Sequence, residues 1–500
     1  MTCKLPSDCL NEILEYLEED KLTLHSCLLV NRLWCEISVR ILWRNIWNFI
    51  NSNQLRPFRI DLSIFNTLFA CLPNESKELL YKNEIFIPTS ISKPMFNYAA
   101  FCKVLSIYGV DKLVDNIFRD KPTINSLSLE DRNYLATNEI IKMFANQIYS
   151  LKKLSCYYHH CNINFSFPYF PGARNLLELH CSSNLPSDFF YQLSQLCHNL
   201  QILSIDFHNY DASNELKELV SLQNSLKTLK LSAYDSSWKN IIPALKNHTN
   251  TITKLHLYGD SGNLPFSFVS SFTNLQEFIF SFIDGINFED FKILQYVNFS
   301  KLQTLKIPYQ CPKPEYIMKF LENNGKNILK FHTDENDKAL SLSVAKFCPN
   351  LKSLFIIFNN GELDILKTIF NNCQNLESIK VWCGKSHFSE YLSEKGLFET
   401  IINHSSKNFC ELKIYNSSNS DVTLEDLESF FISWMNRTPK KLLSFIIIKD
   451  DYYYDKCKSL DDRKEIMKII EKYEKLGVIK FGTIGYEEED KEEEEVYYYQ

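Results

Sequence analysis

The chain has 500 residues, 45% of them hydrophobic, so it is long enough for several domains or one elongated array and too apolar for wholesale disorder. Its 54 Lys and Arg against 61 Asp and Glu give a net charge of −7, which does not favour a nucleic-acid-binding protein, because such proteins usually carry a basic patch. Only 12 glycines are present, which is few for an enzyme rich in phosphate-binding loops.

The first twenty residues, MTCKLPSDCLNEILEYLEED, carry acids where a secretory signal needs an apolar core. The longest apolar runs, such as Phe445–Ile448, are far shorter than the roughly 20 residues that span a bilayer. We therefore expect a cytoplasmic or nuclear protein without membrane contact. In those compartments its 16 cysteines should mostly be free thiols.

The sequence predicts three short helices within the first 47 residues. In the first helix, four apolar residues recur at the spacing of one helix face, and Ser7 is placed to cap it. Further helices are expected over Leu22–Val30 and Trp34–Trp43. Because a unit this small cannot bury all of its apolar surface, we expect it to bind a partner. The residues of that face are Leu10, Ile13, Leu14 and Leu17.

This stretch resembles an F-box. The family pattern has Leu-Pro with a nearby acid, spaced Leu and Ile positions, a small or apolar residue before Leu and Val, a Trp, and a closing Leu-Trp pair. The matching positions are Leu5, Pro6, Asp8, Leu10, Ile13, Leu14, Leu17, Cys27, Leu28, Leu29, Val30, Trp34, Leu42 and Trp43.

An F-box binds the Skp1-type adaptor of an SCF (Skp1–cullin–F-box) ubiquitin ligase, so the resemblance implies adaptor contacts. For each candidate the alternative is packing inside the three-helix unit, and Pro6, at the start of the unit, is the strongest of them. The candidates are Leu5, Pro6, Leu10, Ile13, Leu14, Leu17, Val30 and Trp34.

Residues 48–97 show no clear repeat, and we interpret them as a connector with helices over Ile64–Leu72 and Ser76–Lys82. Beyond them the pattern Leu-x-x-Leu-x-Leu recurs every 23 to 27 residues from position 124 to 376. A period near 25 residues is typical of a leucine-rich repeat, in which each unit is a strand plus a helix and the units must stack to bury their apolar faces. Helices are expected between them, for example over Phe189–Cys197, Asn240–His248 and Leu363–Cys373.

The copies of the frame share an apolar residue at the first, fourth and sixth positions. Weaker copies begin at Cys102, Phe409 and Leu442. The repeats resemble those of F-box proteins over roughly Tyr98–Gly482. The clear copies are Ile124/Leu127/Leu129, Leu151/Leu154/Cys156, Leu176/Leu179/Cys181, Leu200/Leu203/Ile205, Leu226/Leu229/Leu231, Ile252/Leu255/Leu257, Leu275/Phe278/Phe280, Leu302/Leu305/Ile307, Ile328/Phe331/Thr333, Leu351/Leu354/Ile356 and Leu376/Ile379/Val381.

Cysteine recurs in one frame of these repeats, in LCHNLQILSI, FCPNLKSLFI and NCQNLESIKV. Cys197, Cys348 and Cys373 fall where a helix passes to the next strand, and a buried thiol there behaves as a small apolar residue. The segment CYYHHC, Cys156–Cys161, has residues that bind zinc, but no second pair follows at finger-like spacing. We interpret all of these cysteines as core residues and expect no metal.

Residues between the repeat leucines should stand on the open face of the sheet. Early repeats offer mainly polar residues there: Ser126, Ser128, Glu130, Lys153, Ser155, Glu178 and His180. Late repeats offer aromatic residues beside lysines, a composition typical of protein recognition, so we hypothesise a substrate-binding patch. A slip of one residue in the frame would bury it instead. The patch comprises Phe355, Ile357, Lys380, Trp382, Lys413, Tyr415, Ile446 and Ile448.

The chain should close with a helix over Leu460–Leu476 and a strand over Val478–Ile484. The run EEEDKEEEE, Glu487–Glu495, is too charged to pack, and we interpret it as a disordered, solvated tail that could alternatively bind a basic partner. The expected domains are an F-box over 1–47, a helical connector over 48–97, a repeat solenoid over 98–484 and an acidic tail over 485–500.

The sequence thus predicts an α/β protein, in which a three-helix F-box precedes a leucine-rich-repeat solenoid with parallel strands on the concave side and helices on the convex side. By resemblance it would be a substrate receptor of a ubiquitin ligase. Its partners would be a Skp1-type adaptor, a cullin and RING subunit reached through the adaptor, and a protein substrate. We expect neither a catalytic residue nor a cofactor. The alternative is a repeat scaffold that acts outside a ligase.

Overall fold

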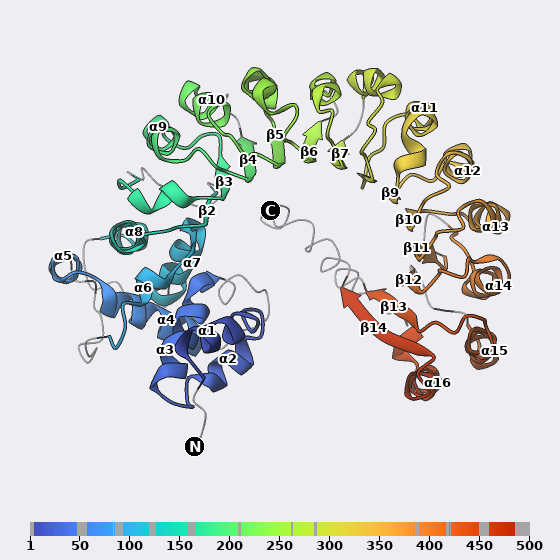
Figure 1. Ribbon diagram of the computed structural model, residues 1–500, viewed down its shortest axis with the longest axis horizontal. Coiled ribbons are helices and arrows are strands. Elements are labelled where there is room, and N and C mark those ends of the chain that lie inside the picture. The colour runs from blue at the N-terminus through green and yellow to red at the C-terminus, as the bar shows by residue number, and fades with distance from the viewer. Residues whose placement is uncertain are drawn as a thin grey trace. The chain divides into compact units, whose positions relative to one another are not determined.

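The computed structural model describes residues 5–47, 58–83, 85, 94–119, 127–157, 167–208, 212–261, 264–284, 288–385, 390–416, 420, 422–449 and 460–485 (Figure 1). The chain divides into two compact units. Unit 1 is Met1–Leu231 with Asn240–Asn247, and unit 2 is Ser232–Lys239 with His248–Gln500.

Unit 1 begins with helices and continues with alternating strands and helices. Two elements, β5 (Thr228–Tyr234) and η4 (Trp238–His248), have residues in both units. The other elements of unit 1 are α1 (Ser7–Glu15), α2 (Lys21–Cys27), α3 (Arg32–Leu42), η1 (Trp43–Asn45), α4 (Phe58–Cys71), α5 (Asn74–Lys82), α6 (Tyr98–Phe101), β1 (Val104–Ser106), α7 (Ile107–Phe118), α8 (Leu129–Gln147), β2 (Lys153–Cys156), η3 (Pro171–Asn175), β3 (Glu178–Ser182), α9 (Ser187–Leu196), β4 (Ile202–His208) and α10 (Asn214–Ser221).

Unit 2 repeats the alternation to its end, with 3-10 helices in place of α-helices in its first repeats. Its elements are β6 (Lys254–Ser261), η5 (Ser267–Ser271), β7 (Glu277–Asp284), η6 (Glu289–Tyr296), β8 (Thr304–Ile307), α11 (Pro314–Asn324), η7 (Gly325–Asn327), β9 (Lys330–Thr333), α12 (Lys338–Phe347), β10 (Ser353–Ile356), α13 (Leu363–Asn372), β11 (Ser378–Cys383), α14 (Glu394–His404), β12 (Glu411–Asn416), α15 (Leu424–Met435), β13 (Leu443–Lys449), η8 (Leu460–Asp462), α16 (Lys464–Lys475) and β14 (Ile479–Gly485).

Strands that follow one another in the sequence pair in parallel. In unit 1 this holds for β1 through β4, and in unit 2 for β6 through β14. Within unit 2 the strands lie side by side on the inner side of a bend, and the helices lie on the outer side (Figure 1). The predicted α/β leucine-rich-repeat fold is confirmed. The side of the strands turned away from the helices is called the inner face below.

The repeat frame predicts the core. Leu203, Leu255, Leu305 and Leu412 have no exposed surface, because each is covered by its own helix and by both neighbouring repeats. The frame cysteines belong to this core: Cys197, Cys348 and Cys373 each occupy the C-cap of a helix and are buried. The Cys197 thiol donates to the carbonyl of Ala173 one repeat earlier at 2.9 Å. Burial raises the pKa of the Cys197 and Cys373 thiols to about 12.

One predicted repeat is wrong. Leu127 and Leu129 form no strand, since Leu129 begins α8 and Ser128 caps that helix by accepting a hydrogen bond from the Asp131 amide at 3.1 Å. Glu130 lies in the first turn of the same helix, so neither it nor Ser128 belongs to the inner face. Ile124 and Ser126 lie outside the described residues. The weaker copy at Cys102 is the real first repeat, because β1 follows it.

The remaining predicted elements are present, although the first connector helix begins at Phe58 rather than at Ile64. The connector contains α4 and α5, and the chain ends with α16 and β14. The helix expected over Asn240–His248 is instead the 3-10 helix η4, which contains Pro243. The weak copy at Leu442 is displaced by one residue at its start: Leu442 is half exposed, and Leu443 is buried in its place. The acidic run Glu487–Glu495 lies outside the described residues.

Candidate functional site

The three expected helices are present as α1, α2 and α3, but α2 begins one residue and α3 two residues before the predicted start, and α2 ends at Cys27 rather than Val30. Pro6, not Ser7, occupies the N-cap of α1. Asp20 caps α2 by accepting from the Thr23 amide at 3.0 Å, and Asn31 caps α3 by accepting from the Trp34 amide at 3.1 Å. Because Asn31 starts a new helix, Leu28, Leu29 and Val30 form the bend between α2 and α3.

Two of the residues predicted to contact the adaptor lie instead in the core of these helices. Leu10 is 3% exposed and Leu14 is 1% exposed, so their burial argues against the direct contact predicted for them. Leu17 and Trp34 are partly buried and pack against the same core. The buried cluster consists of Leu10, Leu14, Leu24, Cys27, Ile37, Ile41 and Leu42.

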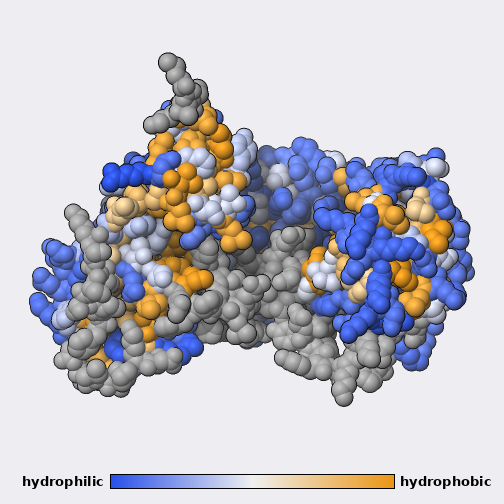
Figure 2. Space-filling view, turned by 90° about the horizontal axis from the view of Figure 1, so that it is seen from below, coloured by the Kyte–Doolittle hydropathy of each residue, from blue (hydrophilic) through white to orange (hydrophobic). Residues whose placement is uncertain are grey.

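The other predicted contacts lie at the surface. Leu5, Ile13 and Val30 are 55%, 49% and 56% exposed, and Pro6 is exposed beside Leu5. Sequence reasoning missed further apolar residues on the same helices and their bend. Figure 2 shows apolar residues gathered over the left lobe, where α1–α3 lie. The additional residues are Tyr16, Leu22, Leu29 and Leu33. Leu22 and Leu33 fall off the buried stripes of α2 and α3, whereas Tyr16 is the C-cap of α1 and Leu29 lies in the bend.

An ion pair fixes the end of α1. Arg44 contacts both carboxylate oxygens of Glu15 and lies 3.4 Å from Glu18. The hydrogen bond from Arg44 lowers the pKa of Glu15, although burial alone would raise it. The pair therefore ties η1 to α1 and closes the three-helix unit.

Two tryptophans anchor the three-helix unit to the first repeats. Trp47 donates its indole N–H to the carbonyl of Val104 in β1 at 2.7 Å, and its ring lies 5.9 Å from that of Phe144. Trp43 lies 4.7 Å from Tyr98. A Cβ on Gly109 would meet the Trp47 ring at 2.7 Å, so only glycine fits there without displacement. The exposed apolar surface of α1–α3 is therefore held firmly against the repeats of unit 1.

The inner face of unit 1 carries a partly buried polar network around the buried His180. The Tyr157 hydroxyl lies 2.8 Å from Nδ1 of His180, and Nε2 of His180 lies 2.6 Å from the Glu178 carboxylate. Lys153 lies 3.1 Å from Glu178 across the β2–β3 pair. Burial would raise the pKa of Glu178, but His180 and Lys153 bring it down to about 2. Both ring nitrogens of His180 are occupied, and its side chain is 2% exposed, so the network holds the sheet together rather than offering a base to a substrate.

The predicted substrate patch on the inner face of unit 2 is less open than expected. Phe355, Ile357, Lys380 and Ile448 are between 2% and 9% exposed, so the prediction that they present open surface is wrong. The strand periodicity places them on the inner face but does not report what packs over them. Trp382, Lys413, Tyr415 and Ile446 are partly exposed. The Trp382 and Tyr415 rings lie 4.7 Å apart, so the aromatic part of the patch is contiguous.

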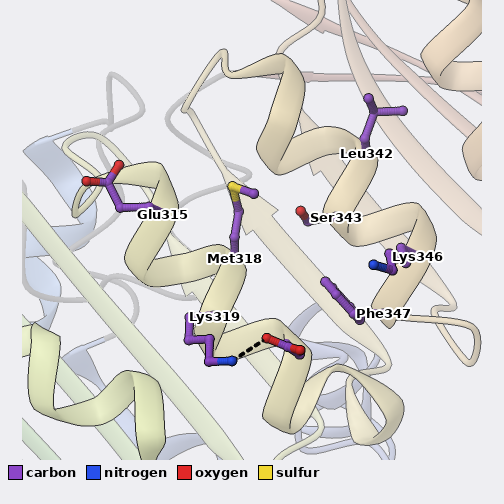
Figure 3. Close-up of a pocket in the computed structure, with 8 residues that line it drawn as sticks. Glu315, Met318, Lys319, Leu342, Ser343, Lys346 and Phe347 are labelled. Carbon is purple, nitrogen blue, oxygen red and sulfur yellow. Dashed lines mark hydrogen bonds and ion pairs between the residues drawn. The ribbon is translucent and has the colours of Figure 1, made fainter.

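A groove of ≈390 Å³ lies between α11 and α12 on the outer side of unit 2 (Figure 3). The Lys319–Glu322 ion pair, 2.6 Å long, closes one wall, and Met318, Leu342 and Phe347 supply apolar lining. None of its lining residues is a histidine or a cysteine. It is a gap between adjacent repeat helices and lacks the convergent acid, base and nucleophile of a catalytic pocket.

No group of three or more His, Cys, Asp or Glu side chains suited to a metal ion occurs among the described residues. Cys156 is buried in β2 beside Cys181 of β3, and Cys161 lies outside the described residues. Every cysteine in the described part of the chain is a free thiol. Over the same residues, no helix is long and apolar enough to cross a bilayer.

Comparison with known proteins gives a single kind of match. No protein-family model matches the chain, and no curated protein matches it. Among solved structures the chain is similar to one described as "Crystal structure of Rad7 and Elc1 complex in yeast", at 12% identity and a TM-score of 0.40, over 95% of this chain and 91% of that chain. A likeness of this size carries no argument about function.

Proposed function

We propose that this chain is the substrate-recognition subunit of an SCF-type ubiquitin ligase. Helices α1–α3 dock on a Skp1-type adaptor, which brings in the cullin and RING subunit, and the repeats bind a protein substrate. The observation that carries the proposal is the surface of α1–α3: the ordered F-box-like set leaves Leu5, Pro6, Ile13, Leu29 and Val30 exposed on a unit whose core is already filled.

The apolar surface supplies the energy for docking. Removing apolar area from water is worth about 25 cal/mol per Å², and the centre of an interface usually holds a few large apolar anchors. Ile13 and Val30 are about half exposed on the folded chain, so each can lose water to a partner without unfolding its own core.

In this role the chain is not an enzyme and needs no cofactor. It accelerates ubiquitin transfer by holding a substrate lysine near a charged conjugating enzyme, which is an effect of proximity and orientation. Such a ligase would work in the cytoplasm or the nucleus. The same chain without adaptor binding would be a repeat scaffold, and the experiment below separates the two roles.

The test is a binding assay of the purified full chain with a recombinant Skp1-type adaptor. We expect the wild type to bind and Ile13→Asp to weaken binding at least tenfold, because a carboxylate would be buried without a partner. Ile293→Asp is the matched control: Ile293 is also 49% exposed and also lies on a helix, the 3-10 helix η6 in unit 2.

The expected result is loss of binding in Ile13→Asp with retention in Ile293→Asp. If the folded wild type does not bind the adaptor, the ligase assignment fails and the scaffold remains. If both substitutions weaken binding equally, the adaptor does not use α1 as its docking surface.

A further inference from the structure

The net charge of the chain is concentrated at one place. The segment Glu487–Glu495 holds eight acids and one lysine, a balance of −7. Without those nine residues, 53 acids face 53 lysines and arginines, so the rest of the chain is neutral. The rest of the chain therefore has no net positive charge to balance the acidic run. Any attraction must come from a local group of basic residues.

The inner face of unit 2 carries an aligned row of residues with several basic side chains. The strand register aligns one residue from each of β6 to β14 into this row, which contains three lysines, two histidines and no acid. The row comprises His256, Ile279, Lys306, His332, Phe355, Lys380, Lys413, Ile446 and Gly482. The Lys380 ammonium lies 4.6 Å from the Phe355 ring centroid, and the His332 ring lies 4.5 Å from the same ring.

The acids nearest this row stand in the adjacent row and already have partners. Glu277 lies 2.7 Å from His256, and the hydrogen bonds and charges around it bring its pKa down to about 2 against the effect of burial. Glu411 accepts a hydrogen bond from Ser378 at 2.6 Å. From β8 to β12, Lys306, Lys380 and Lys413 therefore supply the positive charge of the inner face, and His332 pairs with Asp334 at 3.2 Å; these three lysines and His332 are called the basic row below.

An apolar row runs beside the basic row. Trp382, Tyr415, Ile448 and Ile484 are aligned by the register of β11 to β14. The tail likewise has a charged part followed by an apolar part. The acidic run, which could face the basic row, is followed by Val496 and three tyrosines, which could face the apolar row. The inner face and the tail are thus complementary in charge and in apolar character.

The tail can reach the basic row. It starts after Gly485, where β14 ends, and neighbouring strands are about 4.8 Å apart, so β12 and β11 lie roughly 10 and 14 Å away across the sheet. An extended chain covers about 3.3–3.6 Å per residue, so Glu495 can stand up to roughly 35 Å from Gly485. That length exceeds the roughly 29 Å to β8 and Lys306.

We propose that the acidic segment Glu487–Glu495 docks on the basic row of its own unit 2 and occupies the inner face there. The surface then recognises acidic peptide segments, and the chain's own tail is its resident occupant. The inference does not depend on adaptor binding, because it concerns unit 2 alone. An acidic segment of another protein would have to displace the tail to bind.

The direct test is carbodiimide cross-linking of the wild-type full chain, at low salt, followed by mass spectrometry of the monomer fraction. We expect amide bonds between carboxylates of Glu487–Glu495 and Lys306 or Lys413, the two lysines of the row that are partly exposed. Lys319, whose side chain is 44% exposed on α11, is the control and should carry no tail cross-link. Tail cross-links spread evenly over surface lysines, or no tail cross-links at all, would overturn the proposal.

A second measurement uses a variant of the full chain in which the eight acids are replaced by glutamine. A labelled peptide EEEDKEEEEVYYYQ should bind this variant at least tenfold more tightly than the wild type, because the resident competitor has lost its charge. Raising the salt from 50 to 500 mM should remove the difference, since screened charges no longer steer the tail. Equal binding to both chains would contradict the proposal, whatever the result with the adaptor.

Discussion

Helices α1–α3 and the repeats of unit 2 bury their apolar residues in different ways. In unit 2 the strands β8, β10 and β12 each have a paired strand on both sides, and Leu305, Leu354 and Leu412 on them are at most 1% exposed. The three helices have neighbours on one side only, and Tyr16, Leu22 and Leu29 remain more than 80% exposed. A stack of repeats therefore supplies its own partners, whereas the helical unit has apolar surface left for a separate one.

The largest effect is expected in the stacked core. Phe280 has no exposed surface and lies between Phe278, at 5.0 Å, and Phe291, at 5.2 Å. Phe280→Ala should lower the free energy of unfolding by about 3–5 kcal/mol, because it removes a large buried ring and leaves a cavity. Denaturant unfolding monitored by circular dichroism measures it. A loss below about 1 kcal/mol would show that neighbouring repeats close over the gap.

Two adjacent residues of α1 should respond in opposite ways. Leu14→Ala should cost about 2–5 kcal/mol of stability, since Leu14 is 1% exposed in the core of α1–α3. Ile13→Ala should change the stability of the free chain by less than about 0.5 kcal/mol, because Ile13 is 49% exposed. The hydrogen-exchange rates of the α1–α3 backbone amides measure the loss of stability in each variant. Equal effects would mean that α1 packs in another orientation.

The pH dependence of stability should show the contribution of one carboxylate–histidine pair in each unit, Glu178–His180 and Glu277–His256. The pKa of Glu178 in unit 1 and of Glu277 in unit 2 is about 2, below the ordinary 4.5. A lowered folded pKa stabilises the fold above pH 4.5, and this stability is lost as the pH falls toward 2. Glu178→Gln and Glu277→Gln should each flatten the decline in melting temperature over that range. Unchanged slopes in both variants would remove the pairs as a source of acid sensitivity.

The smallest effect is expected at an exposed ion pair. Lys367 lies 2.8 Å from Asp364 on α13, where the two side chains are 40% and 89% exposed. Solvent screens such a pair, so Lys367→Ala should leave the denaturation midpoint unchanged within error. The same denaturation assay measures this. A larger loss would show that surface charge matters more to the repeats than burial indicates.

The sequence predicts the buried side of each repeat well and the open side poorly. The first, fourth and sixth positions of the frame, such as Leu200, Leu203 and Ile205, are wholly buried, because stacking forces those residues inward. The copy at Ile124 failed because its last frame residue, Leu129, begins α8, and the signal for that helix start is the capping pair Ser128 and Asp131.

The interaction surfaces show the same limit. Helical spacing identifies Leu10 and Leu14 as one face, but it does not say whether that face is turned to the core or to a partner; only packing decides that they are core. Strand alternation likewise places Phe355 and Ile357 on the inner face, yet both are under 9% exposed. Local periodicity predicts which way a side chain points, whereas its burial depends on which residues pack against it from elsewhere in the chain.

The most direct test of the account is hydrogen exchange of the full chain with and without a Skp1-type adaptor. We expect slower exchange over residues 5–17 and 28–34, where exposed apolar residues of α1 and of the α2–α3 bend lose water, and no change in unit 2. Protection confined to the repeats, or no change at saturating adaptor, would contradict the assignment of α1–α3 as the docking surface.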